Sequence, residues 1–199
     1  MSVDWGKENA WEKQWWGNCA NTFIEECKQF YYSGKMGLKW ENNGFIDLQG
    51  KSVLDIGGGP TSLLLKTYNS KVRTVVDPCN FPNWVNSRYN CAGILFRPLK
   101  GEQILDWVAY DFDEVWMYNV LLHVQDPIKV INNAKAKSKI IRVVEYINTG
   151  IEPGHPHTFT PRQLDEYFGG IGDIDNNAPS PVNAPVWYGI FKGDNYEKL

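Results

Sequence analysis

The chain of 199 residues is 43% apolar and 22% charged, a balance typical of one folded domain and not of a disordered chain. Its formal net charge of −3 argues against a protein that holds nucleic acid mainly through phosphate contacts, because such proteins carry a basic face. No apolar run approaches the roughly 20 residues that span a bilayer, and no apolar leader opens the sequence. We therefore expect a cytoplasmic protein whose four cysteines, none in a C-x-x-C pair, are free thiols and not metal ligands.

The first 45 residues predict two helices, over residues 4–16 and 19–33, that form a lid on a core over residues 51–195 of a single domain. In the second stretch Phe23, Cys27, Phe30 and Tyr31 recur at helical spacing. Tryptophans crowd the first sixteen residues, at Trp5, Trp11, Trp15 and Trp16. They indicate either packing on the core or an aromatic wall over a ligand, and both interpretations stay open.

From residue 51 onward, short apolar runs alternate with amphipathic stretches. The predicted strands are Ser52–Ile56, Val72–Val76, Gly93–Phe96, Glu114–Met117, Lys139–Tyr146 and Val186–Lys192. The predicted helices are Thr61–Tyr68, 81–88, Gly101–Tyr110, Pro127–Ala136 and Pro161–Phe168, the last with Thr160 as its N-cap. This alternation predicts an α/β fold with a mostly parallel, Rossmann-like sheet covered by helices on both faces, which binds ligands at the carboxyl ends of its strands.

A run of three glycines, Gly57, Gly58 and Gly59, follows the first core strand. Glycines there let the backbone turn tightly and let a ligand approach without a Cβ in the way. Asp55 at the strand end could hold this turn or accept a hydrogen bond from a ligand ammonium. The alternative is a glycine-rich turn that binds nothing.

Asp77 ends the second core strand, where a carboxylate can accept hydrogen bonds from the two hydroxyls of a ribose. The glycine turn and this acid together suit either a nicotinamide dinucleotide or an adenosyl cofactor. In the nicotinamide pattern G-x-G-x-x-G, Ser62 replaces the third glycine. The glycine turn and Asp77 alone do not distinguish a nicotinamide dinucleotide from an adenosyl cofactor.

Several segments between residue 51 and about residue 193 resemble the class I S-adenosylmethionine-dependent methyltransferases of the small-molecule type. The similar segments are VLDIGGGPTSLLLK, VVDP, FDEVWMYNVLLHVQDP, KIIRVVEYI, GHPHTFTPRQLDEYF and APVWYGIFKG. The resemblance implies a seven-stranded sheet with an antiparallel last strand, S-adenosyl-L-methionine as cofactor and a small-molecule methyl acceptor. It leaves the acceptor itself and the oligomeric state unidentified.

The resemblance also implies which residues bind the cofactor. Asp55, Gly57, Gly58 and Gly59 would line its methionine part, and Asp77 would hold the ribose. Pro78 or Cys79 would flank the adenine. Lys100 stands where many relatives have an acid, and Glu102 is the nearest acidic residue. Asn119, with Tyr118 before it, would face the methionine or the acceptor.

The acceptor site is expected to involve Tyr31, Tyr118 and His155, and the candidate general base is His157, with Glu145 as the alternative. A metal site formed by His155, His157 and Glu152 is disfavoured, because such sites need three or four ligands. Three other functions stay open: an RNA methyltransferase, a nicotinamide-binding oxidoreductase and a cofactor-binding module without catalysis. The oxidoreductase would need a Tyr-x-x-x-Lys set in the segment that directly follows the fourth strand, and none stands in that place.

Overall fold

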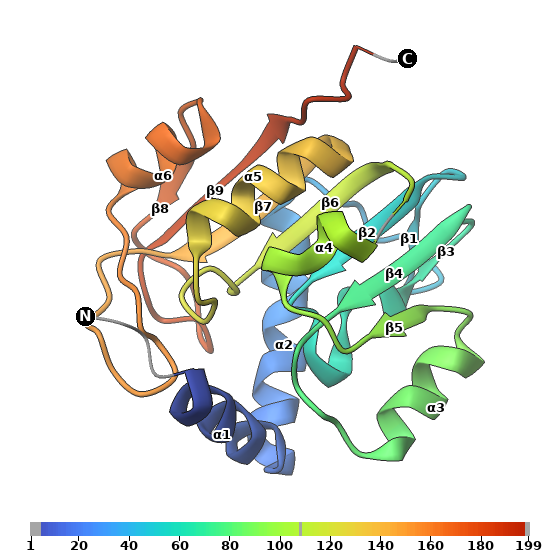
Figure 1. Cartoon of the computed structure of the whole chain (residues 1–199), viewed down its shortest axis with the longest axis horizontal. Helices are drawn as coiled ribbons and strands as arrows, with labels where there is room; N and C mark the ends of the chain where they lie inside the picture. The colour runs from blue at the N-terminus through green and yellow to red at the C-terminus, as the bar shows by residue number, and fades with distance from the viewer. Residues whose placement is uncertain (1–4, 108, 198–199) are drawn as a thin grey trace.

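The computed structural model describes residues 5–107 and 109–197, and a seven-stranded sheet in the order β5-β4-β2-β6-β7-β9-β8 forms its centre (Figure 1). The strands are β2 (Ser52–Ile56), β4 (Val72–Val76), β5 (Leu95–Arg97), β6 (Phe112–Tyr118), β7 (Ser138–Tyr146), β8 (Asp173–Asp175) and β9 (Val186–Lys192). Neighbouring strands are parallel from β5 to β7, and β9 pairs antiparallel with both β7 and β8. The predicted fold class is confirmed.

The central strands form because their side chains are apolar on both faces. All five residues of β2 are buried, and so are the last five of β6. Strands buried on both sides are typical of parallel sheets between two layers of helices. The core therefore lies above and below β2 and β6, and the strand ends meet at one edge of the sheet.

Helices cover both faces of this sheet (Figure 1). The helices are α1 (Trp5–Trp16), α2 (Cys19–Lys35), α3 (Asn83–Cys91), α4 (Ile104–Trp107), α5 (Pro127–Lys137) and α6 (Pro161–Phe168). Helices α4, α5 and α6 lie on one face and α2 crosses the other, while α1 lies below the carboxyl ends of the strands. Thr160 caps α6 as predicted, accepting a hydrogen bond from the Gln163 amide.

The helix predicted over Thr61–Tyr68 is wrong. Two short 3₁₀ helices, η1 (Gly59–Thr61) and η2 (Leu63–Lys66), replace it and lead into β3 (Thr67–Tyr68), which pairs with β1 (Ile46–Asp47). Ser62 between them has ψ of 140°, outside the helical region, and its side chain caps η2. The hydroxyl of Ser62 is also bonded to Asp55, so tertiary contacts override the local helical pattern.

The other differences lie at the ends of elements. The helix expected over Gly101–Tyr110 is a 3₁₀ turn, η3 (Gly101–Gln103), followed by α4, and Ala109 and Tyr110 are not helical. The short strand β8 has no apolar run that would predict it. In α2 the expected helix is present, but its stripe of Phe23, Cys27 and Phe30 faces outward; the two phenylalanines are 67% and 71% exposed.

Candidate functional site

The glycine turn is held from below by a buried polar network. The hydroxyls of Ser62 and Tyr118 both donate to one oxygen of Asp55, at 2.5 and 2.6 Å. Asp55 is fully buried, and burial raises the pKa of its carboxyl to about 7, although the two hydroxyls oppose the shift. Asp55 thus holds the turn, one of the two roles that the sequence left open, and does not line the cavity described below.

The turn also needs glycine for steric reasons. Gly57 has φ of +74°, and a Cβ there would lie 2.1 Å from Cγ2 of Val120. A Cβ on Gly58 would meet the carboxylate of Asp55 at 2.6 Å. A side chain at either position would push the turn off the sheet edge.

Asp77 lies beside this turn, at the end of the neighbouring strand β4. One of its oxygens accepts a hydrogen bond from the Gly59 amide at 3.0 Å, and the other accepts from the Cys79 amide at 2.9 Å. Burial raises the pKa of the Asp77 carboxyl to about 6, against the effect of these amides. Each carboxylate oxygen keeps capacity for a further donor.

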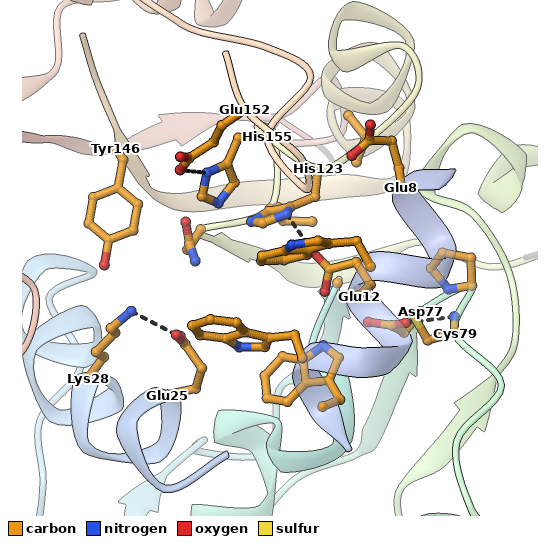
Figure 2. A pocket seen from close by; sticks show the side chains of 18 residues that line it. Glu8, Glu12, Glu25, Lys28, Asp77, Cys79, His123, Tyr146, Glu152 and His155 are labelled. Atoms are coloured by element: carbon orange, nitrogen blue, oxygen red, sulfur yellow. Dashed lines mark hydrogen bonds and ion pairs between the residues drawn. The ribbon is translucent and has the colours of Figure 1, made fainter. Parts of the chain in front are cut away.

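A cavity of about 260 Å³ opens where Gly57 and Asp77 meet, and Figure 2 shows its walls. Its described lining residues are Glu8, Trp11, Glu12, Trp15, Trp16, Glu25, Lys28, Gly57, Asp77, Pro78, Cys79, Asn119, Val120, His123, Val124, Tyr146, Glu152 and His155. They come from α1, α2 and the segments that follow β2, β4, β6 and β7. The cavity therefore lies at the carboxyl edge of the sheet, as the sequence predicted.

Helix α1 closes this cavity with aromatic and acidic side chains. Trp11 and Trp15 stack with ring centroids 5.3 Å apart, and Glu12 forms an ion pair with Nδ1 of His123 at 2.6 Å. Glu8 accepts a hydrogen bond from the Gly154 amide at 2.6 Å. These contacts join α1 to the segments that follow β6 and β7.

Trp16 separates the cavity from a smaller hollow of about 40 Å³. Its indole lies over Gly59, 3.0 Å from the position that a Cβ would take. Trp16, Glu25, Gly57 and Asn119 line both spaces, and Tyr118 and Gly58 line the smaller one. Oδ1 of Asn119 is buried there and has no hydrogen-bond partner among the described residues. A shift of the indole would join the two spaces.

The cavity ends, away from Asp77, at two pairs of charged or titratable side chains. Lys28 donates to Glu25 at 2.7 Å and lies 5.7 Å from the ring centroid of Tyr146. His155 lies with Nδ1 2.9 Å from a carboxylate oxygen of Glu152. Figure 2 shows both pairs facing the same space.

Apart from Asp55 under the turn and Gly59 beneath Trp16, four of the residues predicted for the site lie outside both spaces. The Tyr31 hydroxyl donates to Asp175 at 2.9 Å, between α2 and β8. Glu145 is buried and accepts hydrogen bonds from the Val120 and Leu121 amides, and burial raises the pKa of its carboxyl to about 7. Glu102 and His157 line a separate hollow of about 800 Å³ beside α5, where Nε2 of His157 lies 2.7 Å from the Val124 carbonyl oxygen.

Most of the cavity residues on α1 and α2, and also His123, were not predicted from the sequence. Glu8 and Glu12 are one helical turn apart, as are Trp11 and Trp15, so each pair shares a helix face. This spacing is visible in the sequence, but the side of the helix that meets the sheet is not.

Comparison with known proteins supports the fold independently of the sequence. No family model matches the chain, and no curated protein matches it by sequence. The N-methyltransferase NodS of Bradyrhizobium japonicum WM9, solved with S-adenosyl-L-homocysteine, has a TM-score of 0.66 at 12% identity, over 94% of this chain and 99% of that one. The fold is that of the class I S-adenosylmethionine-dependent methyltransferases.

Two further structures share this methyltransferase fold. A putative methyltransferase of Haloferax volcanii, solved with the Trm112 activator, has a TM-score of 0.64 at 12% identity, over 94% of this chain and 97% of that one. The Burkholderia thailandensis 1,6-didemethyltoxoflavin-N1-methyltransferase has a TM-score of 0.60 at 13% identity, over 89% and 82%. At these identities the likeness covers the fold and not the substrate.

The cavity fits the adenosyl cofactor that this fold implies. Asp77 offers carboxylate oxygens to a ribose diol, and the unpartnered Oδ1 of Asn119 offers an acceptor to an ammonium group. Carboxylates and indole faces around the space suit a sulfonium cation. Within residues 5–107 and 109–197, no three His, Cys, Asp or Glu side chains are placed to hold a metal ion, and no helix is long and apolar enough to cross a membrane.

Proposed function

We propose that this protein is an S-adenosylmethionine-dependent methyltransferase with a small-molecule acceptor. The observation that carries the proposal is that Gly57 and Asp77 lie on one cavity wall, at the carboxyl ends of β2 and β4. In sheets of this kind ligands bind at that edge. NodS and the toxoflavin enzyme, both named as N-methyltransferases, support the reaction class.

In this proposal one cofactor molecule occupies both of the spaces that Trp16 separates. Asp77 accepts hydrogen bonds from the ribose, and Pro78 and Cys79 flank the base. Gly57, Gly58 and Asn119 receive the methionine part in the smaller hollow, and Trp16 moves aside to join the spaces. The bound cofactor supplies an electrophilic methyl group, and the chain holds it in line with an acceptor and excludes water.

The N-terminal segment, residues 1–45, is proposed as the lid of this site. Its described part supplies Trp11, Trp15 and Trp16 to the cavity wall, each half-buried. The ion pair of Glu12 and His123 and the hydrogen bond of Glu8 hold the lid closed. Because these contacts are few, α1 can open at moderate cost to admit ligands.

Calorimetric titration with S-adenosylmethionine, S-adenosylhomocysteine and NAD tests the cofactor. We expect saturable one-to-one binding of the first two, accompanied by a change in tryptophan fluorescence as Trp16 moves. NAD should not bind. Binding of NAD alone would instead favour an oxidoreductase.

Turnover needs a separate test, because cofactor binding does not establish catalysis. Protein incubated with methyl-labelled S-adenosylmethionine and small molecules should transfer label to a small product. Label found in RNA, with binding that weakens steeply with salt, would favour the RNA methyltransferase. Binding without transfer to any acceptor would leave only a cofactor-binding module.

A further inference from the structure

The two ends of the cavity differ in position and in chemistry. The end near Asp77 follows β4, and the end near Tyr146 follows β7, three strands away in the sheet. At a spacing of about 4.8 Å per strand these ends are about 14 Å apart. Figure 2 shows Asp77 and Cys79 on one side of the space and Lys28, Tyr146 and Glu152 on the other. If the Asp77 end holds the adenosyl group, the opposite end remains for the acceptor.

The cavity is rich in carboxylates. Glu25 and Glu152 line the acceptor end against one lysine, and Glu8 and Glu12 line the part of the cavity nearer Asp77. Such a surface attracts a cation and repels an anionic acceptor. The stacked indoles of Trp11 and Trp15 add faces that attract cations further.

Lys28 places an ammonium group of the chain itself at this end of the cavity. Its Nζ lies against the Glu25 carboxylate and near the face of Tyr146. Burial alone would lower the pKa of Lys28, yet Tyr146 and Glu25 raise it above its ordinary value. The site therefore stabilises a protonated amine even when it is partly removed from water.

His155 is placed to remove a proton from such an amine. An ionised carboxylate only accepts hydrogen bonds, so Nδ1 of His155 must carry the proton that faces Glu152. Nε2 then keeps its lone pair and can accept a proton. The charged or titratable groups that face this ring are Glu152 on its own loop, His123 at 4.7 Å between ring centroids, and Glu12 from α1.

The pKa values of the two neighbouring imidazoles are shifted in opposite directions. Burial lowers the pKa of His123, but Glu12 outweighs it and raises the pKa above the ordinary value. Burial and the adjacent His123 both lower the pKa of His155, more than Glu152 raises it. His123 is thus the imidazole of the pair that protonates first as the pH falls, and His155 is the one that keeps a free lone pair to lower pH.

We propose that the end of the cavity between Lys28 and His155 binds an amine and that His155 is its general base, with Glu152 as the positioning residue. This inference rests on the proposed methyltransferase function. An ammonium acceptor first gives a proton to Nε2 of His155. The free amine nitrogen then bonds to the methyl carbon while the carbon–sulfur bond breaks and its electron pair stays on sulfur. The products are a methylated ammonium, a neutral thioether and a protonated His155.

Binding of shape-matched probes tests the amine without any turnover. Protein saturated with S-adenosylhomocysteine is titrated with 2-phenylethylamine, 2-phenylethanol and 3-phenylpropionate by calorimetry. We expect the amine to bind at least about tenfold tighter than the alcohol, and the carboxylate to bind most weakly. Equal or tighter binding of the carboxylate, or no binding of the amine, would overturn the proposal.

Proton NMR of the three imidazoles tests the placement of the amine. The signals are assigned with His123→Gln and His157→Gln variants, since the chain has three histidines. The amine should shift the His155 signal and leave that of His157 in place, and His155 should titrate below His123. A response of His157 alone would move the site to the outer hollow and contradict the proposal.

Transfer of labelled methyl groups to primary amines, and to alcohols of the same carbon skeletons, tests the base. We expect amines to be labelled and His155→Gln to slow the transfer about 100-fold at unchanged cofactor affinity. Glu152→Gln should lower kcat less and shift its pH profile to lower pH, because the carboxylate supports the protonated imidazole. His157→Gln tests the base predicted from sequence and should have little effect. Wild-type rates in His155→Gln would overturn the assignment, whereas absence of cofactor binding in the wild-type protein would instead refute the methyltransferase function.

Discussion

The glycine turn and the helix that covers it are held in different ways. The turn rests on Asp55 and Ser62, both fully buried, and on Tyr118, which is 8% exposed. Helix α1 is attached through half-buried side chains such as Trp11 and Glu12. Fully buried hydrogen bonds break only when the core around them opens, whereas half-exposed contacts open at lower cost. We therefore expect the glycine turn to keep its position during ligand binding and helix α1 to move.

The largest effect of a single substitution is expected from Gly57→Ala. The new methyl group would collide with Val120 at a backbone φ of +74°, so we expect a loss of about 3 kcal/mol in the free energy of unfolding, measured in urea. Gly50→Ala is the matched control, because Gly50 has φ of +75° and open space around it. It should cost about 1 kcal/mol. Equal losses in the two variants would mean that the turn is not packed as described.

The buried acids predict how stability depends on pH. Burial raises the pKa of Asp55 and Glu145 to about 7 and that of Asp77 to about 6, above the values near 4 expected in the unfolded chain. Between pH 5 and 8 the folded protein therefore binds more protons than the unfolded chain, and the raised pKa of His123 acts in the same direction.

Consequently, the free energy of unfolding in urea should fall by several kcal/mol as pH rises from 5 to 8. Asp113→Asn should not change this difference, because hydrogen bonds from Ser52 and Lys139 outweigh burial and lower the pKa of Asp113 to about 2. If the free energy of unfolding instead rises from pH 5 to pH 8, the carboxyls of Asp55, Asp77 and Glu145 are exposed to solvent in the folded protein.

Asp77→Asn should act on binding more than on folding. We expect cofactor affinity to fall more than tenfold in calorimetry, since an amide has one acceptor oxygen where the carboxylate has two. Asp113→Asn removes a carboxylate at the opposite end of the sheet and should leave affinity unchanged. In the wild-type protein affinity should also fall below about pH 6, as Asp77 becomes protonated.

The smallest effect is expected from Glu12→Gln in the covering helix. The variant loses the ion pair with His123, whose partners are each 18% exposed, at a cost of about 1 kcal/mol. Amide hydrogen exchange should quicken in α1 and stay unchanged in α3. Uniform exchange across both helices would show that α1 is not a separately opening unit.

The fold was predictable because its signals are local. The run VLDI is apolar on both faces of a strand, and Gly57 to Gly59 follow it directly, so the turn and Asp77 could be placed by spacing alone. The helix expected after the turn failed because Asp55 and Tyr118 bind the segment through contacts that no local pattern contains.

The acceptor end of the cavity was less predictable. His157 lies against the Val124 carbonyl oxygen from the outer hollow, and Tyr31 donates to Asp175, so neither predicted side chain lines the cavity. His123 was not among the predicted site residues, and it reaches the cavity wall by pairing with Glu12 across 111 residues of chain.

The sequence by itself determined the α/β architecture, the glycine turn and the acid beside it, because hydrophobic periodicity and backbone freedom act over a few residues. Only the tertiary structure decided which side chains from α1, α2 and the loop after β7 face one cavity. Their meeting depends on the side on which each helix packs and on the direction in which each loop leaves the sheet. Both are set by burial of the whole chain, which no short stretch of sequence encodes.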